Sequence, residues 1–150
     1  MRREETVDHH IKTAWHAIAR MYNQQAVQYD ATMSMGFVLL NINSEEGTPA
    51  TKIAPLMGLE ARSLTRLLKS MEEKKLIYRE ADKFDKRSVR IRLTREGKAK
   101  KEKAREKVLR FNEVVRSEIP NNKLQIFFEV VQNITQLIEQ NSIYEKDSKG

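Results

Sequence analysis

One predicted helix, over residues 60–74, carries a face of cationic and hydroxyl side chains. Arginines on such a face can donate bidentate hydrogen bonds to guanine, whereas serine, threonine and lysine can reach bases or phosphates. Residues near the start of a helix in the major groove reach deepest, so we rank Arg62, Ser63 and Arg66 above Lys69. The candidate DNA-reading residues of this helix are Arg62, Ser63, Thr65, Arg66 and Lys69.

A second group of cations lies in a polar turn between two predicted antiparallel strands, over residues 76–79 and 88–93. Cations at the tip of such a hairpin can reach a minor groove or its phosphates, with arginine favoured where the groove is narrow. The turn also contains Asp82 and Asp85, which we expect to bind backbone donors or to pair with a nearby arginine. The candidate DNA-binding residues here are Lys83, Asp85, Lys86, Arg87 and Arg90.

The elements before the hairpin predict a helix-turn-helix. Thr48 is expected to cap a short helix with Pro49 in its first turn, and Gly58 is expected to end it. Pro55 removes one backbone donor and should kink this short helix. The helix over residues 60–74 follows directly. A helix, a turn, a second helix and a basic hairpin together predict a winged helix that reads DNA.

Long amphipathic helices are predicted on both sides of this unit. One spans residues 5–29, and Thr32 is expected to cap a second helix that reaches residue 42. After the hairpin, Thr94 is expected to cap a charged helix, and a break at Pro120 precedes an apolar-faced last helix. The predicted fold class is mainly α with a small β-hairpin wing.

The domain organisation follows from these elements. Residues 32–97 are predicted to form the winged helix-turn-helix domain, and residues 1–31 and 98–150 a helical dimerisation region. The outer helices are longer than the winged unit can cover, so their apolar faces need a partner, and a two-fold homodimer is the commonest solution. Closure of these faces on each other within one chain is the alternative.

The charge is concentrated where the predicted DNA-binding elements lie. The 150 residues carry 28 Lys and Arg against 21 Asp and Glu, a formal charge of +7. Residues 60–110 hold 19 of the basic and 9 of the acidic residues, a surplus of ten. A one-sided positive field suits a polyanion, although lysine and arginine also keep helical proteins solvated.

The stretch from Gly58 to Gly97 is similar to the core of the MarR family of bacterial transcriptional regulators. The most specific shared residues are Asp82, Asp85, Arg87 and Ser88, followed by the run Leu93-Thr94-Arg95-Glu96-Gly97. The resemblance implies a homodimer whose outer helices interlock while two winged helices hold a pseudo-palindromic operator on double-stranded DNA, usually to repress transcription. It also implies that Arg87 enters the minor groove with Asp85 as its positioning partner.

Two residues depart from the family pattern. The family commonly has glycine where Lys75 stands, so a left-handed helix end there must be made by a lysine or avoided. Pro55 stands where the family often has a helix former. Either residue could alter the angle at which the recognition helix enters the groove.

The resemblance further implies a small-molecule effector, often aromatic or anionic, bound in a cleft between the dimerisation helices and the winged helix. The candidate lining residues are Trp15, His16, Ile18, Arg20, Met35, Leu39 and Phe111, and ordinary core packing is the competing interpretation of them. Since the chain has no cysteine, thiol oxidation is excluded as the trigger.

Several other classes are disfavoured by the sequence. The histidines, at positions 9, 10 and 16, lack the closer spacing of helical metal sites, so we assign no metal and no cofactor. No pattern of catalytic residues or phosphate-binding glycines is present, which argues against an enzyme. No apolar run could span a membrane, and we expect a soluble cytoplasmic protein.

The predicted function is therefore a sequence-specific transcriptional regulator that acts as a homodimer and, as the resemblance implies, as a repressor. The competing hypothesis is a basic architectural or adaptor protein that coats nucleic acid without reading its sequence, or a winged helix that contacts RNA or protein. Salt dependence and sequence preference distinguish the two hypotheses.

Overall fold

The structure, a computed structural model, describes residues 1–141 and 143–144. Residues 142 and 145–150, the end of the predicted helical region 98–150, lie outside the described residues. The chain divides into two compact units, Met1–Val108 and Leu109–Gly150. The predicted winged helix, residues 32–97, lies inside the first unit.

The first unit begins with the long helix that the sequence predicts. Helix α1 spans Val7–Ala26, with 3-10 turns at Arg3–Glu5 and Val27–Tyr29. Helix α2 spans Met33–Leu40, and the Thr32 hydroxyl accepts a hydrogen bond from its third residue, as expected for an N-cap. Both predicted helices are confirmed.

The helix-turn-helix consists of α3, Ala50–Met57, and α4, Ala61–Glu73. Gly58 has a left-handed φ of 63° and ends α3, as the sequence predicts. Helix α3 continues through Pro55 to its last residue. Although the missing proline N–H removes one backbone hydrogen bond, it leaves the two-turn helix intact.

The prediction that Thr48 caps α3 is wrong, because Thr48–Pro49 form a short strand, β1. The N-cap position belongs to Pro49, which has no side chain to accept a capping bond. The Thr48 hydroxyl instead accepts a hydrogen bond from the backbone N–H of Asn43, at 2.9 Å. It therefore closes the loop before α3 rather than the helix itself.

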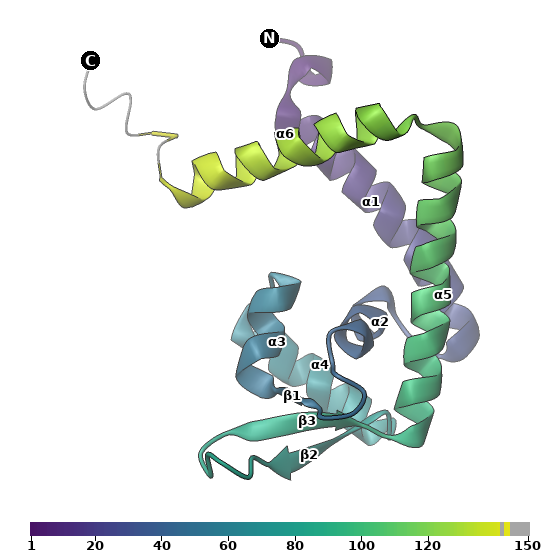
Figure 1. The fold of residues 1–150 in the computed structure, drawn as a ribbon, viewed down its shortest axis with the longest axis vertical. Helices are drawn as coiled ribbons and strands as arrows, with labels where there is room; N and C mark the ends of the chain where they lie inside the picture. The colour runs from purple at the N-terminus through teal and green to yellow at the C-terminus, as the bar shows by residue number, and fades with distance from the viewer. Residues whose placement is uncertain (142, 145–150) are drawn as a thin grey trace. The chain divides into compact units, whose positions relative to one another are not determined.

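The sheet has three antiparallel strands in the order β1-β3-β2. Strand β2 spans Ile77–Ala81 and strand β3 spans Val89–Leu93, with Arg79 opposite Ile91. The hairpin is confirmed, whereas the third strand was missed because two residues carry no alternating pattern. Figure 1 shows α2, α3 and α4 on one side of this sheet, with the hairpin extending beyond them.

The core of the first unit lies between these three helices and the sheet. Its side chains alternate along the strands and recur at helical spacing along α2 and α4, as burial of one face requires. The buried set consists of Met35, Val38, Leu39, Ile42, Ile53, Leu64, Leu68, Met71, Leu76, Ile77, Ile91 and Leu93.

Helix α5, Arg95–Glu118, begins at the base of the hairpin. The Thr94 hydroxyl accepts a hydrogen bond from the Gly97 N–H at 2.9 Å, which confirms it as the N-cap. The same hydroxyl donates to the Lys75 carbonyl at 2.7 Å. A Cβ on Gly97 would lie 2.0 Å from the Leu76 carbonyl oxygen, so this close approach requires glycine.

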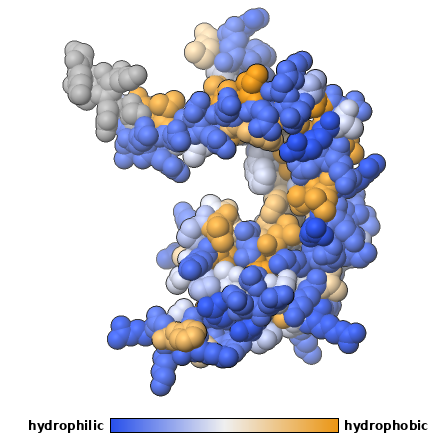
Figure 2. Space-filling model, viewed as in Figure 1, coloured by the Kyte–Doolittle hydropathy of each residue, from blue (hydrophilic) through white to orange (hydrophobic). Residues whose placement is uncertain are grey.

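The second unit contains the last part of α5 and helix α6, Asn121–Glu139, which begins after Pro120 as predicted. Large apolar side chains of α6 are exposed, and Figure 2 shows them as hydrophobic surface along this helix. They include Ile126, Phe127, Val130, Leu137 and Ile138. This unit therefore leaves most of its apolar helix face uncovered.

Helix α4 is followed by Lys75, which adopts the left-handed conformation. Lys75 has a φ of 60°, its N–H donates to the Glu72 carbonyl, and the Leu76 N–H donates to the Met71 carbonyl. This pair of bonds is a Schellman motif, whose left-handed position favours glycine. Of the two alternatives that the sequence allowed, a left-handed lysine or no left-handed position, the structure has the left-handed lysine.

We expect Lys75→Gly to stabilise the protein, because glycine adopts a positive φ without the steric cost that a Cβ imposes. The expected gain in the free energy of unfolding is about 1 kcal/mol, reduced by the greater freedom of glycine in the unfolded chain. Urea denaturation followed by circular dichroism measures it. Lys74→Gly, at the neighbouring position with a φ of −80°, is the control and should destabilise.

Candidate nucleic-acid interface

The predicted reading face of α4 is exposed in the structure. Arg62, Ser63, Thr65, Arg66 and Lys69 are all exposed, whereas Leu64, Leu68 and Met71 are buried against the core. The Thr65 hydroxyl donates to the Ala61 carbonyl one turn earlier, at 2.9 Å. The helix thus divides into an apolar face that anchors it and a cationic face that is open to a ligand.

The cations of this face are not used within the described residues. Arg62, Arg66 and Lys69 make no ion pair or side-chain hydrogen bond with any described residue, and they lie at positions i, i+4 and i+7 of one face. The ion pair of the neighbouring region joins Arg79 and Glu72, at 2.8 Å. Three unpaired cations in one line suit the phosphates and base edges of a groove.

Other lysines of the basic region have structural roles instead. Lys74 donates to the Asp30 carbonyl at 2.9 Å and pairs with its carboxylate at 3.1 Å. Lys101 donates to the Ile42 carbonyl at 2.6 Å and to the Ser44 hydroxyl at 2.9 Å. These contacts join α4 and α5 to the loops around α2, so part of the positive surplus serves to position elements.

The turn of the hairpin is ordered by its two aspartates. Asp82 Oδ1 accepts a hydrogen bond from the Phe84 N–H, and Asp85 Oδ1 accepts one from the Arg87 N–H, both at 3.0 Å. The backbone closes the turn through Asp82 N–H to the Ser88 carbonyl, at 3.1 Å. Asp85 therefore binds a backbone donor, the first of the two uses expected for it, and fixes the backbone of Arg87.

The strand arginines hold the base of the wing. The Arg90 guanidinium lies 3.3 Å from the Asp82 carboxylate and donates to the Glu46 and Gly47 carbonyls, also at 3.3 Å. Arg92 lies 2.5 Å from the Glu80 carboxylate and donates to the Glu45 carbonyl at 2.9 Å. Since protein acceptors occupy Arg90, its position favours a role in building the wing over the predicted direct contact with DNA.

The predicted tip cations lie beyond this base. Lys83, Lys86 and Arg87 are exposed, and their side chains make no ion pair or hydrogen bond with the described residues. The wing thus combines an ordered backbone with cationic side chains that remain available to a polyanion. The Arg87 backbone is held by Asp85, and its guanidinium is exposed to solvent and can bind an anion.

The Asp82 carboxyl has a lowered pKa. The hydrogen bond from the Phe84 N–H is the largest cause, and the charge and hydrogen bond of Arg90 lower it further, while burial opposes them. A carboxylate stabilised in this way stays ionised at neutral pH. The wing therefore keeps its internal ion pair under the conditions in which it would meet DNA.

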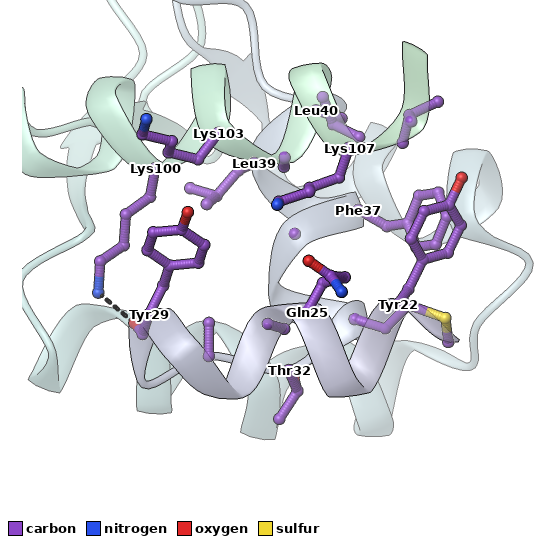
Figure 3. Close-up of a pocket in the computed structure, with 16 residues that line it drawn as sticks. Tyr22, Gln25, Tyr29, Thr32, Phe37, Leu39, Leu40, Lys100, Lys103 and Lys107 are labelled. Atoms are coloured by element: carbon purple, nitrogen blue, oxygen red, sulfur yellow. Dashed lines mark hydrogen bonds between the residues drawn. The ribbon is translucent and has the colours of Figure 1, made fainter. Parts of the chain in front are cut away.

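A pocket lies between α1, α2 and the first part of α5, inside the first unit (Figure 3). Of the predicted effector residues, Leu39 alone lines it. Met35 belongs to the buried core, and Trp15, His16 and Arg20 are exposed on α1 outside this pocket. The pocket therefore lies farther along α1 than the predicted residues of that helix, and the predicted effector contacts stay a prediction.

The pocket has apolar walls and a cationic side. Tyr22 and Phe37 pack edge to face with ring centroids 5.9 Å apart, and burial raises the pKa of the Tyr22 phenol. Helix α5 contributes Lys100, Lys103 and Lys107. Figure 3 shows these lysines on one helix beside the pocket, with Lys100 bonded to the backbone carbonyl of Tyr29 at 2.8 Å.

The sequence contains a pattern that indicates the lysine side of this pocket. The three lysines recur at positions i, i+3 and i+7, so they share one face of a helix with the small Ala104. A Cβ placed on Gly36 of α2 would lie 3.7 Å from the Ala104 side chain, in ordinary contact. Small residues on two facing helices together with a lysine face are the pattern that could have indicated the site.

Within residues 1–141 and 143–144, no three His, Cys, Asp or Glu side chains gather closely enough to hold a metal ion. In the same part of the chain, no helix combines the length and the apolar content that crossing a bilayer requires.

Comparison with known sequences finds a partial match to one family. The model of the MarR family matches residues 31–89, the segment that contains the helix-turn-helix and most of the wing. Residues 31–89 are therefore similar to the MarR family. Curated relatives of the chain include the HTH-type transcriptional regulator SarZ of Staphylococcus aureus, 33% identical over 82 residues. That match covers 55% of this chain and 55% of SarZ, so the chain spans about half the length of the curated relatives it matches.

Solved structures confirm the fold. The S. aureus MepR–DNA complex has a TM-score of 0.77 at 23% identity and covers 90% of this chain and 98% of MepR. The PcaV regulator from Streptomyces coelicolor, in complex with its natural ligand, has a TM-score of 0.78 at 18% identity. That match covers 91% of this chain and 96% of PcaV. The predicted winged helix with long flanking helices is therefore confirmed as the fold class.

We expect Asp82→Asn to destabilise the wing at neutral pH. Because the folded carboxyl has a lowered pKa, its contribution is present above the ordinary value and disappears as the pH falls through the lowered pKa. The difference in stability between the wild type and the variant should therefore shrink towards zero in acid. Chemical denaturation at a series of pH values measures this difference.

Lys83→Gln is the control for this series, because it changes the charge of the same turn without removing an internal bond. It should leave stability nearly unchanged at every pH. A gap between wild type and Asp82→Asn that stays constant into acid would contradict the assigned role of the carboxylate.

Proposed function

We propose that the protein is a sequence-specific DNA-binding transcriptional regulator that acts as a homodimer on a pseudo-palindromic operator, in most settings as a repressor. The observation that carries the proposal is a pair of unused cationic surfaces on one MarR-family domain. One is the exposed face of α4 and the other is the ordered tip of the wing. An enzymatic activity has no part in this proposal.

The two surfaces suit different parts of a duplex. Arg62 and Arg66 can donate two parallel hydrogen bonds to guanine in the major groove, and Lys69 suits a phosphate farther along the helix. Arg87 suits the narrow minor groove beside it, where the negative potential is strongest. The fold similarity to MepR, whose structure is a complex with DNA, supports this arrangement.

The homodimer is supported by the uncovered helix faces. Val7, Ile11 and Trp15 of α1 are 44–54% exposed, and the apolar residues of α6 are exposed as well. Apolar helix faces of this extent are covered by association in most proteins. A two-fold dimer would place two recognition helices about 34–36 Å apart, one turn of DNA, and so favours an inverted-repeat site.

The pocket supports relief by a small-molecule effector. Its tyrosine and phenylalanine walls suit an apolar or aromatic body, and the lysine side suits a carboxylate or another anion. PcaV, whose fold is similar, was solved with its natural ligand. The regulator would act on DNA in the cytoplasm and release its operator when such a compound binds.

The recognition helix and the wing should fail in different ways when their arginines are removed. We expect Arg66→Ala to reduce the preference for the operator over random duplex DNA, because it removes a contact to a base edge. Arg87→Ala should weaken binding to the operator about tenfold and lower the salt dependence, because it removes a cation from the groove. Fluorescence anisotropy over a series of salt concentrations measures both effects.

Arg79→Ala is the matched control, because Arg79 pairs with Glu72 within the protein. Its affinity for DNA should stay close to that of the wild type. Circular dichroism verifies that each variant is folded. Unchanged operator affinity for both Arg66→Ala and Arg87→Ala would contradict the proposed interface.

The effector pocket makes a separate prediction. We expect aromatic carboxylates or medium-chain fatty acids to lower the affinity for the operator, with Lys107→Ala needing about tenfold more of the same compound. Lys107 has no side-chain partner among the described residues, so its removal should not disturb the fold. Lys98→Ala, outside the pocket, is the control. Equal responses of the two variants would contradict an anion site at Lys107.

A further inference from the structure

A phenylalanine stands at the tip of the wing with no apolar partner. The Phe84 side chain is 97% exposed, more than any other large apolar side chain of the described residues except the terminal Met1. Figure 2 shows a small hydrophobic patch at the end of the hairpin, surrounded by hydrophilic surface. Burying a phenylalanine ring is worth about 1.5–3 kcal/mol, which this protein forgoes in its own fold.

The exposure of Phe84 follows from an ordered backbone. Its N–H donates to Asp82 Oδ1 at 3.0 Å, and the Ser88 N–H donates to the Asp85 carbonyl at 3.0 Å. Asp82 is itself held by Arg90, at 3.3 Å. This chain of bonds fixes the residue beyond the edge of the sheet, where the side chain cannot fold back onto the core.

The surroundings of the ring select the kind of partner. Lys83 precedes it, and Lys86 and Arg87 follow after Asp85, whose Oδ1 accepts the Arg87 N–H. The three cationic side chains are exposed and unpaired among the described residues. A cationic rim disfavours a basic or neutral protein surface and favours a polyanion. Nucleic acid combines phosphates with apolar sugar edges and base faces, so it can accept the cations and the ring together.

We infer that Phe84 is a DNA-contacting residue that places its ring against the sugar edges and an adjacent base step of the minor groove entered by Arg87. The inference rests on the proposed function and adds to it an apolar contact with its own signature. Apolar side chains in the minor groove partly unstack a base step, which is cheapest at flexible pyrimidine–purine steps. Phe84 would therefore add affinity and a preference for such a step where the wing binds.

The contact can be separated from the electrostatic part of binding. An apolar ring neutralises no phosphate, so it releases no counterion and leaves the salt dependence unchanged. We expect Phe84→Ala to weaken binding to the operator about tenfold at every salt concentration, with an unchanged slope. Phe84→Leu should keep most of the affinity, because leucine can also serve as an apolar wedge.

Lys83→Ala is the matched control at the neighbouring position. It removes a cation instead of a ring, so it should reduce the salt slope by about one phosphate contact. A fluorescent adenine analogue at the base step under the wing gives a second readout. Its emission should rise when the wild type binds and unstacks the step, and should rise much less with Phe84→Ala.

The outcomes are distinguishable from one another. Equal operator affinity of wild type and Phe84→Ala, or a loss accompanied by a smaller salt slope, would overturn the assignment while leaving the proposed function in place. If the wild type binds no duplex DNA, the proposed function and this inference fail together. Binding of the wild type, but not of Phe84→Ala, to phosphatidylglycerol vesicles without DNA binding would reassign the ring to membrane contact.

Discussion

The arrangement of α4, the wing and α5 depends on the few bonds around Leu76. The Leu76 N–H closes the left-handed end of α4, and its carbonyl accepts the Thr94 N–H at 3.0 Å where the hairpin returns. Thr94 then caps α5 through the Gly97 N–H, in a space that admits no Cβ on Gly97. The recognition helix, the wing and α5 therefore meet at one buried residue, which fixes their relative directions.

The second constraint is that some cations of the wing pair within the protein while others stay exposed at its tip. Arg92 binds the Glu80 carboxylate of β2, and Arg90 binds the Asp82 carboxylate just after β2. Both arginines also donate to carbonyls of the loop before β1, so they make a rigid base. Gly47, with a φ of 72°, allows that loop to approach β3 closely, since a Cβ there would lie 2.7 Å from the Ile91 carbonyl oxygen. Arg90 and Arg92 therefore stabilise the wing, while the exposed cations at its tip remain available to bind a polyanion.

Much of this fold could be predicted from local pattern. The helical periodicity, the caps at Thr32 and Thr94 and the glycine end at Gly58 all depend on contacts within a few residues, so the sequence indicates them directly. Strand β1 and the carbonyl partners of Arg90 could not be predicted, because both depend on segments more than forty residues apart in the chain. The three lysines of the pocket share one helix face in the sequence, but the helices that they face are known only from the folded chain.

The candidate site likewise has one part that local sequence predicts and one part that depends on the folded chain. The exposed face of α4 follows from the spacing of its apolar residues, whereas the roles of the wing residues depend on which acceptors the folded chain supplies. An arginine in a strand next to a basic turn has the same sequence appearance whether it faces DNA or a carboxylate. Arg87 and Arg90 differ in this respect, and only the folded structure distinguishes them.

Selection of binders from a random pool of duplex DNA at physiological salt, followed by sequencing, tests the central claim most directly. The account predicts enrichment of an inverted repeat whose half-sites lie one helical turn apart, because two recognition helices of a two-fold dimer would read it. A pool that stays random while the protein still binds DNA would contradict sequence-specific reading and would indicate a protein that coats nucleic acid through its charge.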